Sequence, residues 1–223
     1  MSLILNIDCA ADKAFVSLAL NASVIASADN PIQKDHAAFL HPAIKTILEE
    51  SGKKFDALDA IAVNAGPGSY TGIRVGMATA KGLCMALNKP LIIINSLEIL
   101  TRDAIINHDG DETHLYCPMI DARRMEVYTA IYNKAGIEVL APTALVLDEN
   151  FYRKYTTLHK LILFGSGAEK CRKLSIFQEA LFIQNVNLPQ AMANLSQEAF
   201  RRKTYADLIF SEPIYLKEFF KQY

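Results

Sequence analysis

Short blocks of apolar residues separated by polar turns open the chain, and each block has the length of a strand. The run from Leu3 to Ile7 is followed by AFVSLAL at 14–20, which alternates apolar and polar positions, and by a further short run at 24–28. Strands joined by such short turns pair with one another, so the pattern predicts an antiparallel three-stranded meander. Apolar residues at helical spacing then predict an amphipathic helix from Asp35 to Ser51, with Pro42 either in its first turn or bending it.

Beyond residue 60 the apolar pattern changes to an alternation of strands and helices. Continuous apolar runs predict buried strands at 60–64 and 91–94, while helical spacing predicts helices at 70–87 and 97–106. Alternating strands and helices favour an α/β fold. Its sheet is expected to have an antiparallel edge, because only the first strands are joined closely enough to form hairpins.

The second half of the chain repeats the layout of the first half. PMIDARRMEVYTAIYN at 118–133 matches LNIDCAADKAFVSLALN at 5–21 in having an apolar strand, Ile-Asp, a short polar turn, an alternating strand and Asn. An apolar strand at 161–164 followed by GSGAEK parallels the strand, Gly-rich turn and helix around 66–81. Chance is one explanation, because a strand, an Asp and a turn often follow one another. A duplicated strand, Asp and hairpin is also the organising feature of the actin-like kinase architecture, and it predicts an N-terminal subdomain at 1–108 and a C-terminal subdomain at 109–223.

Composition narrows the classes of protein that fit this pattern. With 51% hydrophobic residues, 21% charged residues and a net charge of −1, the 223-residue chain is of the soluble globular class and lacks the overall positive charge that drives nucleic-acid binding. A contact with tRNA or DNA must therefore be local or shared with a partner. The four cysteines form no C-x-x-C pair, and the chain shows neither an apolar run of about 20 residues nor a signal-peptide pattern, so a cytoplasmic protein without membrane contact is expected.

The segment GPGSYTGIRVG at 66–76 is the strongest candidate for function. A strand ends at its first glycines, and Ser69 or Thr71 can cap the helix that follows. Free backbone amides at the start of a helix favour phosphate or carboxylate, although a tight turn into a capped helix explains the same residues. Asp8 and Asp121 each follow a strand, where a carboxylate can hold hydrated magnesium beside phosphates or can bind its own turn.

Other residues around these turns give evidence for and against a nucleotide-binding site. The turn CAADK after Asp8 contains no glycine, so its backbone has less freedom to approach a phosphate. Arg74 and Arg123 are the best cationic candidates, unless each pairs with a nearby carboxylate. His36 and His41 are separated by a helical rotation of roughly 140°, so they do not converge on a metal ion. Neither H-E-x-x-H nor G-x-S-x-G occurs, so no motif supports a protease.

Gly72, Gly76 and Ala80 recur at steps of four and place three small residues on one face of the predicted helix. Such a face lets another backbone approach closely. It either packs inside the protein against a sheet or contacts a helix of another subunit. Near the end of the chain, helical spacing continues through 190–207, and SEPIYLKEFF then predicts a final strand and an adhesive tail.

Four segments together resemble the TsaB (YeaZ) family across essentially the whole chain: ILNIDCA, GPGSYTGIRVG, MIDARRMEVY and EPIYLKEFF, in this order. The resemblance implies an α/β fold of the actin-like, ribonuclease H-like type, duplicated, with mixed sheets flanked by helices. It also implies a part in making N6-threonylcarbamoyladenosine at position 37 of tRNA, as a non-catalytic subunit. Such a subunit pairs with the catalytic TsaD and the ATPase TsaE, and it contacts tRNA through the assembled complex. A homodimer of the isolated chain is expected as well, because an exposed helix face of small and apolar residues associates with any partner that covers it.

The resemblance implies no catalytic residue, metal or cofactor of this chain's own, because ATP and metal belong to the partner subunits. In the family the first two long helices form the partner face. The interface residues expected on these helices are His36, Phe39, Leu40, Ile44, Ile47, Gly72, Val75, Gly76, Thr79, Ala80 and Leu83. The residues expected near a nucleotide or near TsaE are Asp8, Gly66, Pro67, Gly68, Ser69, Tyr70, Thr71, Arg74, Asp121 and Arg123.

Two other functions stay open at this point. The same fold suits a stand-alone ATP-dependent kinase-like enzyme, and related proteins have carried the label of a glycoprotease-like peptidase. DCAAD stands where the family usually has Asp-Thr followed by small residues, so a hydroxyl contact is absent at Cys9. This departure argues against nucleotide binding by the chain alone.

Overall fold

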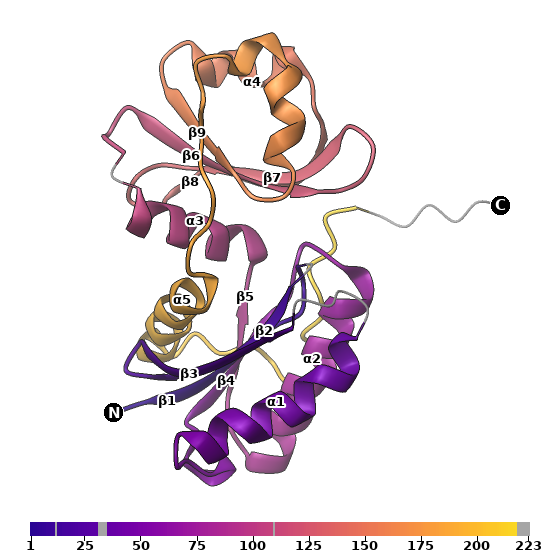
Figure 1. Cartoon of the computed structure of the whole chain (residues 1–223), viewed down its shortest axis with the longest axis vertical. Helices are drawn as coiled ribbons and strands as arrows, with labels where there is room; N and C mark the ends of the chain where they lie inside the picture. The colour runs from indigo at the N-terminus through magenta and orange to yellow at the C-terminus, as the bar shows by residue number, and fades with distance from the viewer. Residues whose placement is uncertain (12, 31–34, 109, 218–223) are drawn as a thin grey trace, which may run out of the picture. The chain divides into compact units, whose positions relative to one another are not determined.

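A computed structural model describes residues 1–11, 13–30, 35–108 and 110–217, and it divides the chain into two compact units (Figure 1). Unit 1 consists of Met1–Ile99 and Asn187–Ile214, and unit 2 consists of Leu100–Val186 with the residues from Tyr215 onward. This division differs from the boundary expected after residue 108. The chain returns to unit 1 at Asn187, because the last helix packs on the sheet of that unit.

Unit 1 contains a five-stranded mixed sheet with the order β3-β2-β1-β4-β5. Its strands are β1 (Leu3–Asp8), β2 (Ala14–Leu20), β3 (Ser23–Asn30), β4 (Ala60–Asn64) and β5 (Leu91–Ile94). The first three strands are antiparallel, whereas β4 runs parallel to β1 and β5 runs parallel to β4. The meander at one edge of an α/β sheet is therefore confirmed.

The two faces of this sheet are covered by different helices, in agreement with the period of two along its strands. Leu5 and Ile7 belong to the apolar cluster with α1 (His36–Glu50) and α2 (Tyr70–Leu87). Ile4, between them in β1, belongs to the cluster with α5 (Leu188–Arg202) on the other face. Helix α3 (Ser96–Asn107) follows β5, and a short 3-10 helix, η1 (Phe55–Ala57), precedes β4.

Helix α1 continues through Pro42, which lies inside the helix at an exposed position and not in its first turn. Helix α5 ends at Arg202, earlier than the apolar spacing predicted, because Lys203 adopts a left-handed conformation with φ 56°. The expected final strand is absent from the described residues, in which only an isolated bridge joins Ala206 to Leu91. Residues 218–220 of that expected strand lie outside the described part of the chain.

Unit 2 repeats the sheet of unit 1. Its strands are β6 (His114–Asp121), β7 (Glu126–Tyr132), β8 (Glu138–Val146), β9 (Lys160–Phe164) and β10 (Leu181–Phe182). The order β10-β9-β6-β7-β8 has the connectivity of β5-β4-β1-β2-β3, with the same antiparallel and parallel pairs. The duplication expected from the sequence is thereby confirmed.

Apart from the part of α3 that belongs to unit 2, the helices of unit 2 are shorter than α1, α2 and α5 of unit 1. They are α4 (Glu149–Thr156) and the 3-10 helices η2 (Ala168–Lys173) and η3 (Ser175–Phe177). The long helix α2 that follows β4 in unit 1 is thus replaced after β9 by two short 3-10 helices, η2 and η3. Among the described residues, no helix is both long enough and apolar enough to cross a membrane.

Candidate functional site

The carboxyl ends of β1 and β4 carry Asp8 and Asn64 side by side in the parallel register. The Asn64 Nδ2 donates to Asp8 Oδ2 at 2.9 Å, and Asn64 Oδ1 accepts from the Ser96 hydroxyl at 2.7 Å and from the Gly66 amide at 2.9 Å. Asp8, Asn64 and Ser96 are all buried. Asn64 therefore ties the end of β1 to the Gly-rich turn and to the start of α3.

The second oxygen of Asp8 accepts from the Ala10 amide at 2.8 Å. Burial raises the pKa of Asp8 above its ordinary value, against the opposing effect of the hydrogen bonds from Asn64 and Ala10. Both oxygens of this carboxylate are thus engaged by donors of the chain itself. This geometry is that of an aspartate that binds its own turn, which is the alternative to the magnesium ligand considered from the sequence.

The Gly-rich turn is also engaged by its own chain. The Ser69 hydroxyl accepts from the Gly72 amide at 3.3 Å and so caps α2, as the sequence predicts. The amide of Ser69 donates to the Ala10 carbonyl oxygen at 2.7 Å. The carbonyl of the β1–β2 turn therefore occupies a donor that an anion at the start of α2 requires.

The glycines of α2 make room for that same turn. A Cβ atom on Gly72 would lie 1.9 Å from the Cys9 carbonyl oxygen, and one on Gly68 would lie 2.2 Å from the Ala10 carbonyl oxygen. Gly76 faces Cys9 at ordinary contact distance, and Ala80 is fully buried. This corrects the expectation of a partner helix at these positions: the small residues admit the strands of unit 1, which is the internal alternative.

Several other residues expected at a partner interface also lie inside unit 1. Leu40, Ile44 and Ile47 are at most 2% exposed because they form the core between α1 and the sheet. His36 and Thr79 are buried too, whereas Phe39, Val75 and Leu83 are half-buried. Amphipathic spacing identified the apolar face of each helix correctly, but this face packs on the sheet.

The outward side of α2 is a different set of residues, which we call the outer face. It consists of the exposed residues Thr71, Arg74, Ala78, Gly82 and Met85. Met85 is 73% exposed, and a Cβ atom on Gly82 would meet nothing within 4 Å. The Arg74 guanidinium stacks on the Tyr70 ring at 3.9 Å from the centroid. The sequence signal for this face was present in Ala78 and Gly82, a second pair of small residues four positions apart.

The C-terminal segment 204–214 is attached beside the outer face. Lys81 Nζ donates to the carbonyl oxygens of Ile209 and Ser211, each at 3.1 Å. The Asp207 carboxylate accepts from the amides of Ile209 and Phe210 at 2.8 and 2.9 Å. The apolar side chains of this turn remain in solvent, Ile209 at 78% and Phe210 at 80% exposure.

Replacing Lys81 by alanine is expected to loosen this segment, because both carbonyl groups lose a charged donor. Amide hydrogen exchange in 204–214 should become faster by on the order of ten-fold. The matched control is Lys45→Ala, since the ion pair that Lys45 makes among the described residues, with Glu49 at 3.7 Å, is exposed. Equal exchange rates in the Lys81→Ala and Lys45→Ala variants would contradict the anchoring role.

Unit 2 has a corresponding turn after β6, with Asp121 in the place of Asp8. Asp121 Oδ1 accepts from Lys170 Nζ and from the Arg123 amide, both at 2.6 Å. Partial desolvation raises the pKa of Asp121, but the hydrogen bonds from Lys170 and from the Arg123 amide outweigh it and hold this pKa below its ordinary value. The carboxylate thus pairs with Lys170, and the Arg123 side chain does not neutralise it.

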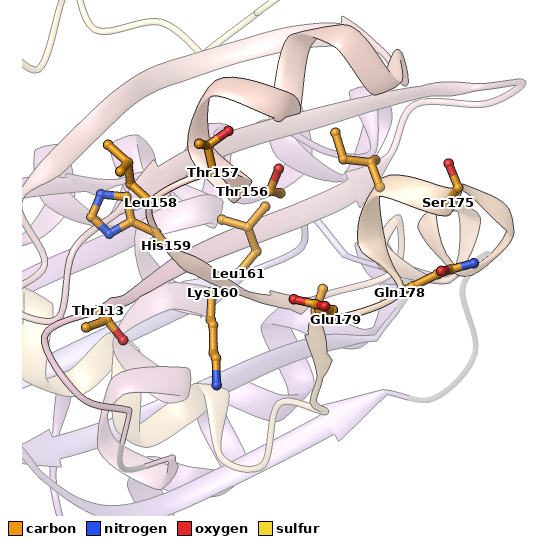
Figure 2. A pocket seen from close by; sticks show the side chains of 12 residues that line it. Thr113, Thr156, Thr157, Leu158, His159, Lys160, Leu161, Ser175, Gln178 and Glu179 are labelled. Atoms are coloured by element: carbon orange, nitrogen blue, oxygen red, sulfur yellow. The ribbon is translucent and has the colours of Figure 1, made fainter.

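The described residues also form a pocket of about 470 Å³ in unit 2 (Figure 2). Its lining comes from the end of α4, from β9 and from the region of η3, and Lys160 extends away from Thr156 and Thr157. The side chains around it are mainly hydroxyl, amide and aliphatic groups. None of the residues selected from the sequence lines this pocket.

Comparison with known proteins gives two kinds of relative. The family model described as TsaD, tRNA N6-adenosine threonylcarbamoyltransferase, matches residues 30–200. The TsaB protein of Bacillus subtilis is 36% identical over 163 residues, covering 72% of this chain and 69% of the relative. A tRNA N6-adenosine threonylcarbamoyltransferase of Zymomonas mobilis is 36% identical over 44% of this chain, but the match covers only 31% of that relative.

Among solved structures, the chain also matches proteins of the TsaB (YeaZ) type over nearly its whole length. YeaZ from Pseudomonas aeruginosa matches with a TM-score of 0.78 at 27% identity, over 97% of this chain and 100% of that chain. The Lmo2764 protein of Listeria monocytogenes, described as a candidate N-acetylmannosamine kinase, matches with a TM-score of 0.52 at 11% identity, over 91% of this chain and 99% of that chain. The second match shows the fold alone, which is of the actin-like type found in such kinases.

Proposed function

Since the chain belongs to the TsaB (YeaZ) family and serves tRNA threonylcarbamoyladenosine biosynthesis, we propose that it does so as a non-catalytic subunit. Its TsaB-named relatives imply a complex with a TsaD-type subunit. In our proposal that partner transfers the threonylcarbamoyl group to tRNA in the cytoplasm. A TsaE homologue joins the pair, and these partners hold ATP and metal. The tRNA is bound by the assembled complex.

The observation that carries this proposal is the closed network at Asp8. A site for nucleotide and magnesium needs free backbone donors and a carboxylate with free oxygens. Here Asn64 and the Ala10 amide engage both oxygens of Asp8, and the Ala10 carbonyl engages the Ser69 amide. The residues that would form a catalytic centre instead hold the hairpin, the Gly-rich turn and α2 together.

The outer face of α2 is the surface that we assign to the TsaD-type partner. Ala78 and Gly82 offer a close approach to another helix, and Met85 offers exposed apolar area. The exposed turn at Ile209 and Phe210 lies beside it, because Lys81 binds that turn. The same surface is proposed to form the homodimer of the isolated chain, and the nearby turn 66–71 to lie closest to the TsaE homologue.

Replacing Ala78 or Gly82 by arginine is expected to abolish stable pairing with the TsaD-type partner. Each arginine puts a long charged side chain where two helices meet, yet both positions are exposed in the isolated chain, so the fold should survive. The measurement is co-elution with the partner in size-exclusion chromatography. Ala141→Arg, at an exposed position of β8 in unit 2, is the matched control and should co-elute normally.

Reconstitution tests the function itself. Unmodified tRNA, threonylcarbamoyl-adenylate and the TsaD and TsaE homologues are incubated with and without this chain, and threonylcarbamoyladenosine is measured. We expect modification to depend on the chain. Equal modification without it would refute the proposed function, and hydrolysis of ATP by the purified chain alone would favour the kinase-like alternative.

A further inference from the structure

The hairpin between β6 and β7 carries two adjacent arginines in a backbone conformation that arginine rarely adopts. Arg123 has φ 68° and Arg124 has φ 49°, both in the left-handed region. Glycine, asparagine or aspartate is the usual residue there, because a Cβ atom comes too close to the backbone carbonyl oxygen in this conformation, and only glycine lacks it while asparagine and aspartate can hydrogen-bond locally. The turn is nevertheless well formed, since the Arg123 amide donates to Asp121 Oδ1 and the Ala122 amide donates to the Glu126 carbonyl oxygen at 3.1 Å.

The carboxylates at the base of this hairpin are already neutralised by lysines. Lys170 pairs with Asp121 at 2.6 Å, and Lys217 pairs with Glu126 at 2.5 Å. Lys170 also donates to the Glu126 carbonyl oxygen at 2.9 Å. Within the part of the chain that the structure describes, the exposed side chains of Arg123 and Arg124 therefore have no carboxylate partner.

The corresponding hairpin of unit 1 differs at the positions directly after its aspartate. Cys9 and Ala10 are small and buried, because α2 lies against them through its glycines, whereas Ala11 and Lys13 are exposed. After β9, unit 2 has the short 3-10 helices η2 and η3 in the place of α2, and η2 carries Lys170, Arg172 and Lys173. After the aspartate of each hairpin, unit 1 thus has two small residues covered by α2, whereas unit 2 has two exposed arginines.

We propose that Arg123 and Arg124 bind phosphodiester groups of the tRNA, an inference that rests on the proposed function in tRNA modification. A guanidinium donates two parallel hydrogen bonds to a phosphate and stays charged at any physiological pH. The net charge of the chain is −1, so an RNA contact must be local, and this hairpin supplies such a place. The phosphodiester backbone of an RNA suits this exposed hairpin better than a free nucleotide does, because small ligands bind in enclosed pockets. Neither arginine lines the pocket of unit 2.

The test is tRNA binding by the assembled complex, with the full chain and the TsaD and TsaE homologues. The double variant Arg123→Asn/Arg124→Asn keeps residues that tolerate a left-handed turn and removes both charges. Binding of an unmodified tRNA transcript is followed by fluorescence anisotropy over a series of salt concentrations. We expect the affinity at low salt to fall on the order of ten-fold to hundred-fold, and the slope of log affinity against log salt to decrease in magnitude by about 1.5 as two phosphate contacts are lost.

Arg201→Asn/Arg202→Asn is the matched control, because it removes an exposed pair of arginines from the last turn of α5. An equal loss in both double variants, or an unchanged affinity and salt slope in the hairpin variant, would overturn the inference. Weaker binding of ATP with unchanged binding of tRNA would overturn it in favour of a nucleotide contact. Reconstitution with and without the wild-type chain separates the two proposals. If tRNA is modified only when the wild-type chain is present, the proposed function stands whatever the hairpin variant does.

Discussion

Alanine at position 72 is expected to destabilise unit 1 by about 3 kcal/mol, although alanine favours a helix more than glycine does. The added Cβ would lie 1.9 Å from the Cys9 carbonyl oxygen, which is backbone and cannot rotate away. Either α2 or the β1–β2 turn must move, and the Ser69 to Ala10 hydrogen bond lies in the same contact. The free energy of unfolding is measured by urea denaturation followed by far-ultraviolet circular dichroism.

Two other glycines of α2 are the controls for this substitution. Gly82→Ala should stabilise the protein by about 0.5–1 kcal/mol, because its Cβ enters open space and only helix propensity changes. Gly76→Ala should be tolerated, since its nearest neighbours lie at 3.6 Å. If Gly72→Ala were as stable as Gly82→Ala, the close contact between α2 and the β1–β2 turn would be refuted.

The second large effect is expected at Asn64, which joins three elements through one amide. Asn64→Asp puts a second carboxylate against Asp8, removes the donor to Asp8 Oδ2 and leaves a buried charge without compensation. We expect a loss of about 3 kcal/mol or more at neutral pH. Ser96→Ala is the milder control, because it removes one hydroxyl donor to Asn64 and adds no charge, and it should cost about 1 kcal/mol.

The pH dependence of the Asn64→Asp variant distinguishes electrostatics from lost packing. Burial already raises the pKa of Asp8, and a neighbouring carboxylate raises it further. The folded state then binds a proton that the unfolded state releases, so this contribution to stability is present below the unfolded pKa and is lost as the pH rises through the folded pKa. Relative to wild type, the variant should regain stability as the pH falls. A deficit that stays constant with pH would contradict this account.

The sequence predicted the strands and the long helices of unit 1, and the duplication of its first hairpin, because these features depend on local patterns. Alternation at 14–20 identified a strand, and the repeated Ile-Asp followed by a polar turn identified the first hairpin of each unit. Whether the small residues of α2 face the sheet of unit 1 or a helix of a partner could not be predicted from such local patterns. Gly72 and Gly76 suit a sheet or a partner helix equally well, and the decision comes from a long-range contact with Cys9.

Two further features depended on information that local patterns lack. The return of α5 to unit 1 is a contact between residues distant in sequence, so an even division of the chain at 108 missed it. The left-handed arginines were missed because arginine gives no signal for such a turn, and Arg123 was selected only for its charge. The assignment of the outer face of α2 to a partner, and of the turn 66–71 to the vicinity of the TsaE homologue, remain predictions.

The path of the chain through the two units has a consequence for synthesis on the ribosome. One face of the first sheet, with Ile4, Phe15 and Ile92, is covered by α5, which is made only after Leu100–Val186. Residues Leu100–Val186 form a continuous stretch and are complete before α5 emerges. The sheet of unit 1 is therefore made first, but one of its apolar faces stays uncovered until α5 has been synthesised. During that interval the growing chain is most exposed to chaperones and to aggregation.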